Sequence, residues 1–439
     1  MNSSQSTQAQ RPLILLLQGP VGPYFRELHQ SLADRGFRVL KVNFNGGDQF
    51  YARQDGIVNF RGSPVQWTEW LNALVAEDTP AAIVLFGDSR PYHVEAVQIA
   101  ALQQITVWCL EEGYVRPNYV TCERSGNNAR SPLREVGAQN RRHPVAEARP
   151  VKNPIGAMAR YAILDAIARI TFGAPFHGNV RHRHRPILRE CARWATSLVR
   201  KAVYYHANHS ILRSILAQQL RDYYVVALQV HDDLNLVRNG NGWTMERLID
   251  EAARSFAQNA PPGSRLLFKV HPLDRGHLPY RRLIAKAARQ HGCAARVKVA
   301  DDRPIGPMIR HSNGVITVNS TSGLIALEQG KPLLALGNAV YCTAALNTLP
   351  PRSSSKLDAF WRDGDVADAM EVKSFFAQMF EESLIGGNFY LPAERLATAD
   401  AVAHRIHQEF VSACLKKLLS VCRIRSPRMG ETWHDSLAG

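Results

Sequence analysis

The sequence predicts an α/β protein in which two Rossmann-like domains face a cleft and a basic, mostly helical insertion separates them. Short apolar runs alternate with helical patterns near the start of the 439-residue chain and again after residue 223, which is typical of parallel sheets. Between these regions, residues 114–221 hold 19 Lys and Arg against 5 Asp and Glu. That segment therefore carries a net charge of +14, out of +15 for the whole chain.

The first domain is expected to cover residues 1–115. Apolar runs predict strands at 13–18, 38–44, 81–86 and 106–110, and apolar residues at helical spacing predict helices at 24–35, 65–76 and 93–103. The first strand ends in a predicted tight loop, Gly19-Pro20-Val21-Gly22.

The insertion is expected to cover residues 116–222. Residues 121–153 are rich in Ser, Asn, Gly, Pro and Arg and predict a loop, whereas 155–172 have a helical composition. A basic run, Arg181-His182-Arg183-His184-Arg185, precedes a second long helical stretch. The charge indicates a negatively charged partner, which can be a nucleic acid, an anionic membrane or a phosphorylated ligand.

The second domain is expected to cover residues 223–395, followed by C-terminal helices over 396–439. Its predicted strands are 224–228, 265–270, 295–299, 314–318 and 332–336, and its predicted helices are 244–258, 278–291, 305–311 and 321–329. Two such domains without a dinucleotide fingerprint suggest the GT-B arrangement. Ligands of these sheets bind beyond the carboxyl ends of the strands, so the motifs should follow strands.

Four motifs do follow predicted strands. They are Glu111-Glu112-Gly113, His231-Asp232-Asp233, His271-Pro272 and Asn319-Ser320-Thr321-Ser322-Gly323. The hydroxyl-rich motif opens a helix, where it can bind phosphate or simply cap the helix. A His at a strand end can donate to a phosphate or only mark a turn. Paired carboxylates can act as acid, base or nucleophile, or remain solvated or cap a helix.

The cysteines and apolar segments predict the compartment. None of the seven cysteines forms a C-x-x-C pair, which argues against a zinc ribbon and fits reduced thiols. The apolar run at 13–17 is too short for a signal peptide, and no run approaches the roughly 18–20 residues that span a bilayer. We therefore expect a cytoplasmic protein that is peripheral to a membrane, without a metal.

Together these segments resemble capsule-polysaccharide Kdo transferases of the KpsS/LipB type, within the GT-B glycosyltransferases that use CMP-activated acidic sugars. The most specific segments are EEGYVRPNYVT, HPLDRG and NSTSGLIALEQGKP, and further similarity lies in VALQVHDDLNL and GGNFYLP. The resemblance extends over most of the chain. Where the family-like pattern reads Q-V-E-D-D, this chain has His231 in place of the Glu.

The resemblance implies a retaining β-Kdo transferase at the inner membrane. It would move Kdo from CMP-Kdo onto a phosphatidylglycerol-type lipid and so prime the β-Kdo linker of a capsule. Asp232 is the expected nucleophile, with Asp233 as the second choice, and Glu111 or Glu112 would be the acid/base. His271 would stabilise the departing phosphate. The expected substrate-binding residues are Gly19, Gly22, Gly113, Arg116, Gln229, His271, Pro272, Asn319, Ser320, Thr321, Ser322, Gly323 and Glu328.

Two alternatives stay open at this point. The chain can be another CMP-sugar transferase, such as a sialyltransferase-like enzyme or a Kdo chain extender. It can also be a basic nucleic-acid-binding or scaffolding protein, although the insertion offers few of the aromatic residues that stack on bases. The expected partners are the CMP-sugar donor, an anionic lipid acceptor, the inner-membrane surface and other capsule-assembly proteins, and not nucleic acid. No cofactor is expected.

Overall fold

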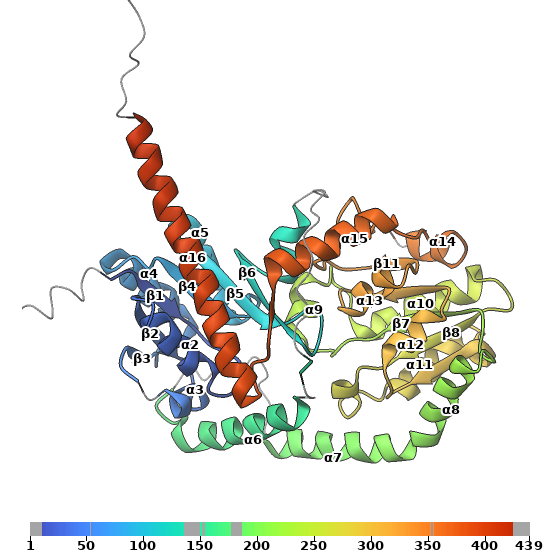
Figure 1. The fold of residues 1–439 in the computed structure, drawn as a ribbon. Helices are drawn as coiled ribbons and strands as arrows, with labels where there is room; N and C mark the ends of the chain where they lie inside the picture. The colour runs from blue at the N-terminus through green and yellow to red at the C-terminus, as the bar shows by residue number, and fades with distance from the viewer. Residues whose placement is uncertain are drawn as a thin grey trace, which may run out of the picture.

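The computed structural model describes residues 11–424, apart from 53, 136–149, 152–153, 177–186, 352 and 354. Within these residues the chain forms two α/β domains that lie next to each other (Figure 1). The basic run at residues 181–185 lies outside the described residues. None of the described helices is long and apolar enough to cross a bilayer.

The first domain is built on a seven-stranded sheet in the order β12-β6-β5-β4-β1-β2-β3. The strands β1 to β5 are parallel, β6 runs antiparallel to β5, and β12 runs antiparallel to β6. The strands are β1 (Leu13–Leu16), β2 (Arg38–Asn43), β3 (Ile57–Asn59), β4 (Ala82–Phe86), β5 (Thr106–Glu112), β6 (Tyr119–Arg124) and β12 (Leu384–Gly386). Its helices are α2 (Tyr24–Ala33), α3 (Gly46–Tyr51), α4 (Pro64–Glu77), α5 (Pro91–Leu102) and the long α16 (Pro392–Ile424).

The second domain is built on a five-stranded parallel sheet in the order β11-β10-β7-β8-β9. Its strands are β7 (Tyr223–Ala227), β8 (Arg265–Lys269), β9 (Val297–Ala300), β10 (Gly314–Thr317) and β11 (Leu333–Ala335). Its helices are α9 (Leu234–Asn239), α10 (Met245–Asn259), α11 (Tyr280–Gln290), α12 (Ile305–Arg310), α13 (Ser322–Glu328), α14 (Ser355–Asp363) and α15 (Ala369–Gln378).

Both sheets are covered by apolar side chains on their two faces, which explains why their strands read as continuous apolar runs. One apolar cluster packs on each face of the first sheet, around Phe25 and Trp67 respectively. Two further clusters pack on the second sheet, around Phe256 and Tyr341. The predicted α/β fold with two Rossmann-like domains is confirmed.

The order of the strands fixes where ligands bind. In each domain the chain builds the sheet outward from a central strand in one direction and then returns to build it in the other. The reversal falls between β1 and β4 in the first sheet and between β7 and β10 in the second. Ligands of open α/β sheets bind beyond the carboxyl ends of strands at such a reversal.

Two strands depart from the predicted domain boundaries. Residues 121–153 were expected to form a loop within the insertion, yet β6 pairs with β5 and extends the first sheet. Residues 384–386 were expected in the second domain, yet β12 pairs with β6. β12 has only three residues, and β6 lies in a stretch of loop-like composition and pairs antiparallel, so local sequence patterns do not reveal them. The chain thus returns to the first domain before α16 packs against α2 (Figure 1).

Three α-helices connect the two sheets, as expected for a mostly helical insertion. They are α6 (Ile155–Phe172), α7 (Ile187–Val203) and α8 (Tyr205–Leu216). In Figure 1, α6 and α7 follow one another along the lower edge of the molecule, α6 under the first domain and α7 toward the second. The described part of the insertion is therefore mainly helical.

The turn between β5 and β6 provides a test of the fold. Gly113 is buried, and a Cβ there would collide with the carbonyl oxygen of Tyr119, which is backbone and cannot move aside. We expect Gly113→Ala to lower the free energy of unfolding by about 1–3 kcal/mol. Gly156→Ala is the matched control, because nothing lies within 4 Å of its Cβ position. Chemical denaturation measures both, and equal stabilities would contradict the packing described for Gly113.

Candidate active site

The carboxylate of Glu111, at the end of β5, is the most strongly perturbed acid of the interdomain site. Burial is the main cause that raises its pKa, the negative charges of Asp233 and Asp88 add to it, and the resulting pKa is about 8. The effect of Asp233 is informative, because that residue belongs to the second domain. A carboxylate of the second domain therefore lies close enough to Glu111 for the two charges to interact.

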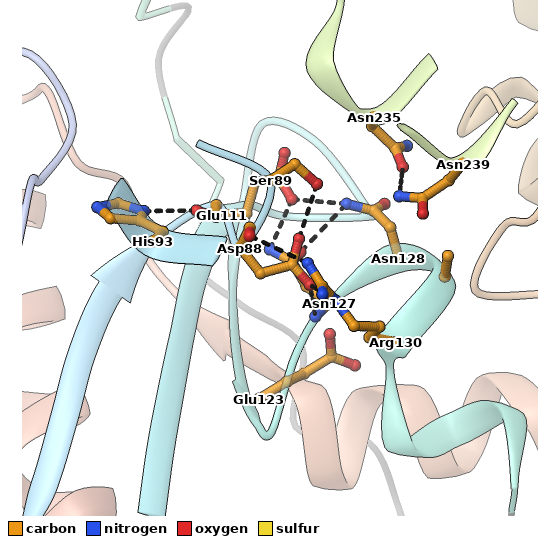
Figure 2. A network of polar contacts seen from close by, with 12 residues as sticks. Asp88, Ser89, His93, Glu111, Glu123, Asn127, Asn128, Arg130, Asn235 and Asn239 are labelled. Atoms are coloured by element: carbon orange, nitrogen blue, oxygen red, sulfur yellow. Dashed lines mark hydrogen bonds and ion pairs between the residues drawn. The ribbon is translucent and has the colours of Figure 1, made fainter. Parts of the chain in front are cut away.

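Two asparagines hold Glu111 in place. The side-chain amides of Asn127 and Asn128 both donate to Glu111 Oε2, at 2.7 Å each. Figure 2 shows how the loop after β6 brings both amides back over the end of β5. A carboxylate oxygen that accepts two amide N–H groups is fixed in position although its burial disfavours charge.

An ion pair between buried Asp88 and exposed Arg130 shapes the loop that carries the asparagines. Asp88, which follows β4, accepts from Arg130 Nε at 3.0 Å and from the backbone N–H of Asn127 at 3.2 Å. Its second oxygen accepts from the Ser89 hydroxyl at 2.9 Å. The loop after β6 is thus pinned to the end of β4, and Figure 2 shows α9 of the second domain beyond it.

A second buried carboxylate ties this loop to the chain that returns from the second domain. Glu123 on β6 accepts from the hydroxyls of Tyr114, Ser131 and Ser383, at 2.7, 2.5 and 2.7 Å. Burial raises the pKa of Glu123 to about 7, although these hydroxyls favour its charged form. The cluster joins β6, the turn before residue 135 and the segment that enters β12.

Glu112 has different surroundings from its neighbour. Its carboxylate pairs with Arg116 at 3.2 Å and accepts from the Tyr390 hydroxyl at 3.0 Å. Arg116 also donates to the carbonyl oxygen of Gly113 at 3.1 Å, so it closes the turn that follows β5. The two acids that the sequence leaves equivalent are therefore distinct, since Glu111 faces the second domain and Glu112 serves an ion pair.

Asp232 and Asp233 follow β7 and also differ in their tasks. Asp233 is the N-cap of α9, and its side chain accepts from the backbone N–H of Asn235 at 2.8 Å. Its charge acts on Glu111. The charge of Asp232 contributes to the raised pKa of Tyr280, whose hydroxyl donates to Asp274, so this carboxylate lies toward the group that holds His231. Asp232 is not the residue that caps the helix.

His231 is oriented by a buried carboxylate. Asp274 accepts from the backbone N–H of His231 at 3.0 Å and contacts its Nδ1 at 2.7 Å. The Tyr280 hydroxyl donates to the same carboxylate. Burial acts to raise the pKa of Asp274, but the bonds from His231 and Tyr280 outweigh it and leave the pKa below its ordinary value. An ionised Asp274 thus supports an imidazole where the family-like pattern has an acid.

His271 opens the short turn after β8, and Pro272 is the first residue of that turn. Nδ1 of His271 accepts from the backbone N–H of Leu273 at 3.2 Å. In the neutral imidazole this bond places the proton on Nε2, which is then a hydrogen-bond donor. Pro272 fits the first position of the turn because that position needs no backbone N–H.

The hydroxyl-rich segment lies after β10 and leads into α13. Ser320 Oγ accepts from the backbone N–H of Ser322 at 3.1 Å and donates to its Oγ at 3.1 Å. Thr321 is the N-cap by backbone position, yet its side chain makes no capping hydrogen bond. Gly323 is buried, and a Cβ there would collide with the ring of Tyr341. The three hydroxyls therefore gather at one strand end, and Gly323 allows close packing beneath them.

The reversal point of the second sheet is held together by two amide side chains. Gln229 Nε2 donates to Asn319 Oδ1 at 2.8 Å, and Gln229 Oε1 accepts from the backbone N–H of Asn319 at 3.0 Å. Asn319 Nδ2 in turn donates to the carbonyl oxygen of Asn235 at 3.0 Å. These predicted substrate-binding residues thus link the ends of β7 and β10 and support α9.

A basic side chain occupies the reversal point of the first sheet. Arg90 donates to Gln18 Oε1 and to the carbonyl oxygen of Gly19, both at 3.0 Å. Burial lowers its pKa to about 10. His93 accepts from the Gln18 N–H at 3.3 Å and contacts the Gly87 carbonyl at 2.6 Å, and burial lowers its pKa to about 3. The neutral imidazole therefore tethers the end of β1 to the loop after β4.

The remaining predicted residues lie further out. Gly22 has a positive φ of 110° and packs near the ring of Tyr161 on α6. Glu328 is exposed at the last position of α13, at the opposite end of that helix from Ser322. The structure brings Glu111, Asp232, Asp233 and the residues around them to the interdomain site, and it does not bring Glu328 there.

Several residues of the site escape prediction from the sequence. Asp88, Asn127, Asn128 and Arg130 organise Glu111, and Asp274 organises His231. Asp88 follows a predicted strand, and Asp274 lies within HPLDRG, so the sequence pattern could have identified these two residues. The asparagines lie in a stretch read as loop. Among the described residues, no group of three or more His, Cys, Asp or Glu side chains is placed to hold a metal ion.

Comparison with known proteins finds a family match over most of this chain. The family model described as capsule polysaccharide biosynthesis protein matches residues 81–390. The chain is 32% identical over 381 residues to the capsule polysaccharide export protein KpsS of Escherichia coli, covering 86% of this chain and 96% of that protein. It is 30% identical over 403 residues to the capsule polysaccharide modification protein LipB of Neisseria meningitidis serogroup B, covering 89% and 94%.

Among solved structures, the chain is similar to the β-Kdo 2,7 transferase of KpsC from Thermosulfurimonas dismutans. The identity is 12% and the TM-score is 0.41, with 82% of this chain and 89% of the other covered.

The raised pKa of Glu111 predicts a pH-dependent effect on stability. Because the folded state holds the Glu111 proton up to about pH 8, whereas an unfolded Glu loses it near its ordinary pKa, charging this residue costs stability progressively between those values. Glu111→Gln mimics the protonated form. We expect it to raise the melting temperature relative to the parent at pH 8.5 more than at pH 5.

Glu112→Gln is the matched control, because it removes the ion pair with Arg116 and should not stabilise the protein at either pH. Differential scanning fluorimetry across this pH range measures both variants. A Glu111→Gln effect that is the same at pH 5 and pH 8.5 would show that the carboxylate does not titrate as described.

Proposed function

Because the chain belongs to the capsule polysaccharide biosynthesis protein family, we propose that it is a glycosyltransferase. It would move Kdo from CMP-Kdo to a phosphatidylglycerol-type lipid. The product would prime the β-Kdo linker of a capsular polysaccharide. One observation carries the proposal. A partly buried carboxylate with a pKa of about 8, Glu111, lies close enough to Asp233 of the other domain for the two charges to interact, and Asp232 is the neighbouring residue. Glycosyl transfer with retention needs a proton-transfer group and a separate nucleophile.

The donor would bind at the second domain. The hydroxyls of Ser320, Thr321 and Ser322 would hold the phosphate of CMP-Kdo, and Nε2–H of His271 would donate to it. The 3.1 Å contact between Ser320 and Ser322 supports a common orientation of these hydroxyls. As the glycosidic bond to the phosphate breaks, charge grows on the phosphate oxygens, and donors placed there lower the barrier.

The first chemical step would be attack of a carboxylate on the anomeric carbon of Kdo. We assign this role to Asp232, with Asp233 as the alternative. Capping of α9 by Asp233 supports this order, because a carboxylate that accepts the Asn235 N–H is a weaker nucleophile and is needed where it stands. The step would release CMP and leave Kdo bound to the enzyme through an ester.

In the second step the acceptor hydroxyl would attack the same carbon while the ester bond breaks and the Asp232 carboxylate leaves, which restores the original configuration. Glu111 would remove the proton of that hydroxyl. Its raised pKa supports this role, since a base with a pKa near the working pH accepts a proton most effectively. Asn127 and Asn128 would keep the carboxylate in line, and no metal or cofactor enters either step.

A second candidate function is transfer of another CMP-activated acidic sugar, or addition of Kdo to a sugar chain. The same phosphate-binding hydroxyls and carboxylates would serve both. In this chain His231 stands where the family-like pattern has an acid, and Asp274 holds its imidazole in place. This difference alters the charge next to the proposed nucleophile and therefore favours the second candidate. Binding to nucleic acid is the candidate from another class, and it rests on the net charge alone.

One experiment separates these candidates. The purified protein is incubated with CMP-Kdo or CMP-sialic acid, together with a phosphatidylglycerol analogue or a Kdo-terminated acceptor, and the products are analysed by mass spectrometry. Kdo on the lipid analogue supports the proposal, and transfer of sialic acid or extension of the Kdo acceptor supports the second candidate. Co-purified nucleic acid without CMP release in any mixture would overturn both enzyme proposals.

The nucleophile predicts a mutant phenotype. We expect Asp232→Asn to reduce transfer by at least about a thousandfold, because the ester can no longer form. CMP binding should change little, since the phosphate contacts lie on other residues. Transfer is measured as Kdo-labelled lipid, and CMP binding by calorimetry.

Two variants control for this substitution. Asp363→Asn, at an exposed position at the end of α14, should leave transfer unchanged. Asp233→Asn should lower the stability of α9 and retain part of the transfer activity. Full activity in Asp232→Asn together with loss in Asp233→Asn would move the nucleophile to the second aspartate.

The donor contacts predict a different phenotype. Ser322→Ala and His271→Gln should each raise the KM for CMP-Kdo by about tenfold, because each removes a hydrogen bond to a charged group. The KM for the lipid acceptor should stay the same. Ser210→Ala on α8, which is exposed, is the matched control. If only the KM for the acceptor rose, these residues would bind the acceptor and not CMP-Kdo.

A further inference from the structure

The outer face of α6 is apolar. Ile155, Ile163, Ile167 and Ile170 share one side of the helix and are between 54% and 67% exposed. The only acid of this helix, Asp165, is buried on the opposite side with Tyr161. An ordinary surface helix keeps its large apolar side chains inward, whereas α6 packs Ala157, Met158 and Ala168 inward and leaves its isoleucines exposed.

The outer face of α7 is also apolar. Leu198, Val199 and Val203 are between 62% and 66% exposed. The side of the helix that packs on the protein is polar, with Ser197 buried and Arg200 partly buried. Figure 1 shows that α6 and α7 follow one another along one edge of the molecule. Both helices expose apolar side chains.

Specific contacts fix α6 in this orientation. The Tyr161 hydroxyl accepts from Arg395 at 2.6 Å, and Arg395 is itself paired with Glu27 at 2.5 Å. Gly46 and Gly47, at the start of α3, have no room for a Cβ because Ala168 and Asp165 of α6 lie against them. The helix cannot rotate to bury its isoleucines without breaking these contacts.

Polar contacts fix α7 in the same way, but on the second domain. Arg200 donates to the carbonyl oxygens of Arg275 and Leu278, at 2.5 and 2.8 Å. Arg275 donates to the carbonyl oxygen of Ser197 at 3.0 Å. A Cβ at Gly276 would collide with the backbone of α7 at Arg193. The two apolar faces are therefore anchored on different domains.

The charge beside these faces is positive. Arg160 on α6 and Lys201 on α7 are exposed next to the apolar side chains. Behind α7, a cavity of about 140 Å³ is lined by four arginines, namely Arg200, Arg275, Arg281 and Arg282, together with Asp301. Among the described side chains of α6 and α7, the single carboxylate is the buried Asp165. Apolar side chains flanked by basic ones are the combination that binds anionic lipid surfaces.

We propose that the outer faces of α6 and α7 form one lipid-binding surface that inserts into the apolar boundary of an anionic bilayer. The four isoleucines of α6 and the apolar residues of α7 would enter the region below the headgroups. Trp194, which is 48% exposed on α7, would lie at the interface that tryptophan prefers. Arg160 and Lys201 would meet the phosphates.

This surface does more than hold a protein near a membrane by charge. Electrostatic attraction is screened by salt, whereas burial of isoleucine side chains is not. Because α6 is anchored on the first domain and α7 on the second, both domains would be held at the same lipid surface. The inference rests on the proposed function only for the choice of phosphatidylglycerol as the probe lipid.

The test is flotation with vesicles of phosphatidylcholine and phosphatidylglycerol, without donor or acceptor. We expect the parent protein to float with the vesicles and to retain part of its binding at high salt. Ile163→Gln/Ile167→Gln should weaken binding by at least about tenfold, because two apolar side chains no longer leave water. Val65→Gln/Leu102→Gln is the matched control, since those two side chains are 76% and 83% exposed on α4 and α5.

A second measurement does not depend on the double variant. Brominated lipids should quench a fluorescence component that Trp194→Phe removes, because quenching requires contact with the acyl chains. Circular dichroism and melting temperature confirm that each variant is folded. Unchanged flotation of the α6 variant, or an absence of quenching at Trp194, would overturn the surface.

Two further outcomes separate this inference from its alternatives. If the parent is a dimer by analytical ultracentrifugation and Ile163→Gln/Ile167→Gln is a monomer, the faces are an interface between copies of the chain and the lipid surface is wrong. Vesicle binding without sugar transfer would overturn the proposed function and retain the surface. Transfer to a water-soluble acceptor without vesicle binding would do the reverse.

Discussion

The partial burial of the Glu111 carboxylate is the constraint on which the interdomain site depends. A buried acid is tolerated only where hydrogen bonds hold it, and here two asparagine amides do so. Those amides reach Glu111 because β6 turns back on β5 and because the Asp88–Arg130 pair pins the loop that follows. Glu123 then ties β6 to the segment entering β12. The position of Glu111 therefore depends on the pairing of β6 and β12 that extends the first sheet.

The positions of the main elements and of the four motifs could be predicted because both follow from local patterns. A buried parallel strand reads as an apolar run, and its carboxyl end is where polar side chains reach a ligand. The different roles of Glu111 and Glu112 could not be predicted. They depend on Asn127, Asn128 and Arg116, whose contacts follow from the antiparallel return of β6, and nothing in the local sequence marks that pairing.

The composition of the insertion reveals its charge but not its exposed apolar faces. Its charge is obvious in the sequence, whereas the apolar outer faces of α6 and α7 are not, because periodicity shows that a helix has two sides and not which side packs. That choice is made by contacts with distant residues. Arg395 and Gly47 contact the packed side of α6, and Arg275 contacts the packed side of α7.

The loop after β8 links the lipid-binding surface to the chemistry. Its Asp274 holds His231 beside the Asp232-Asp233 pair, and its next residues, Arg275 and Gly276, hold α7. A shift of α7 against the second domain therefore strains the same short segment that orients the imidazole. On the other domain, Gly22 in the loop after β1 packs on Tyr161 of α6. Each half of the site thus shares a loop with one of the two helices, so the geometry of the surface and the geometry of the site are set together.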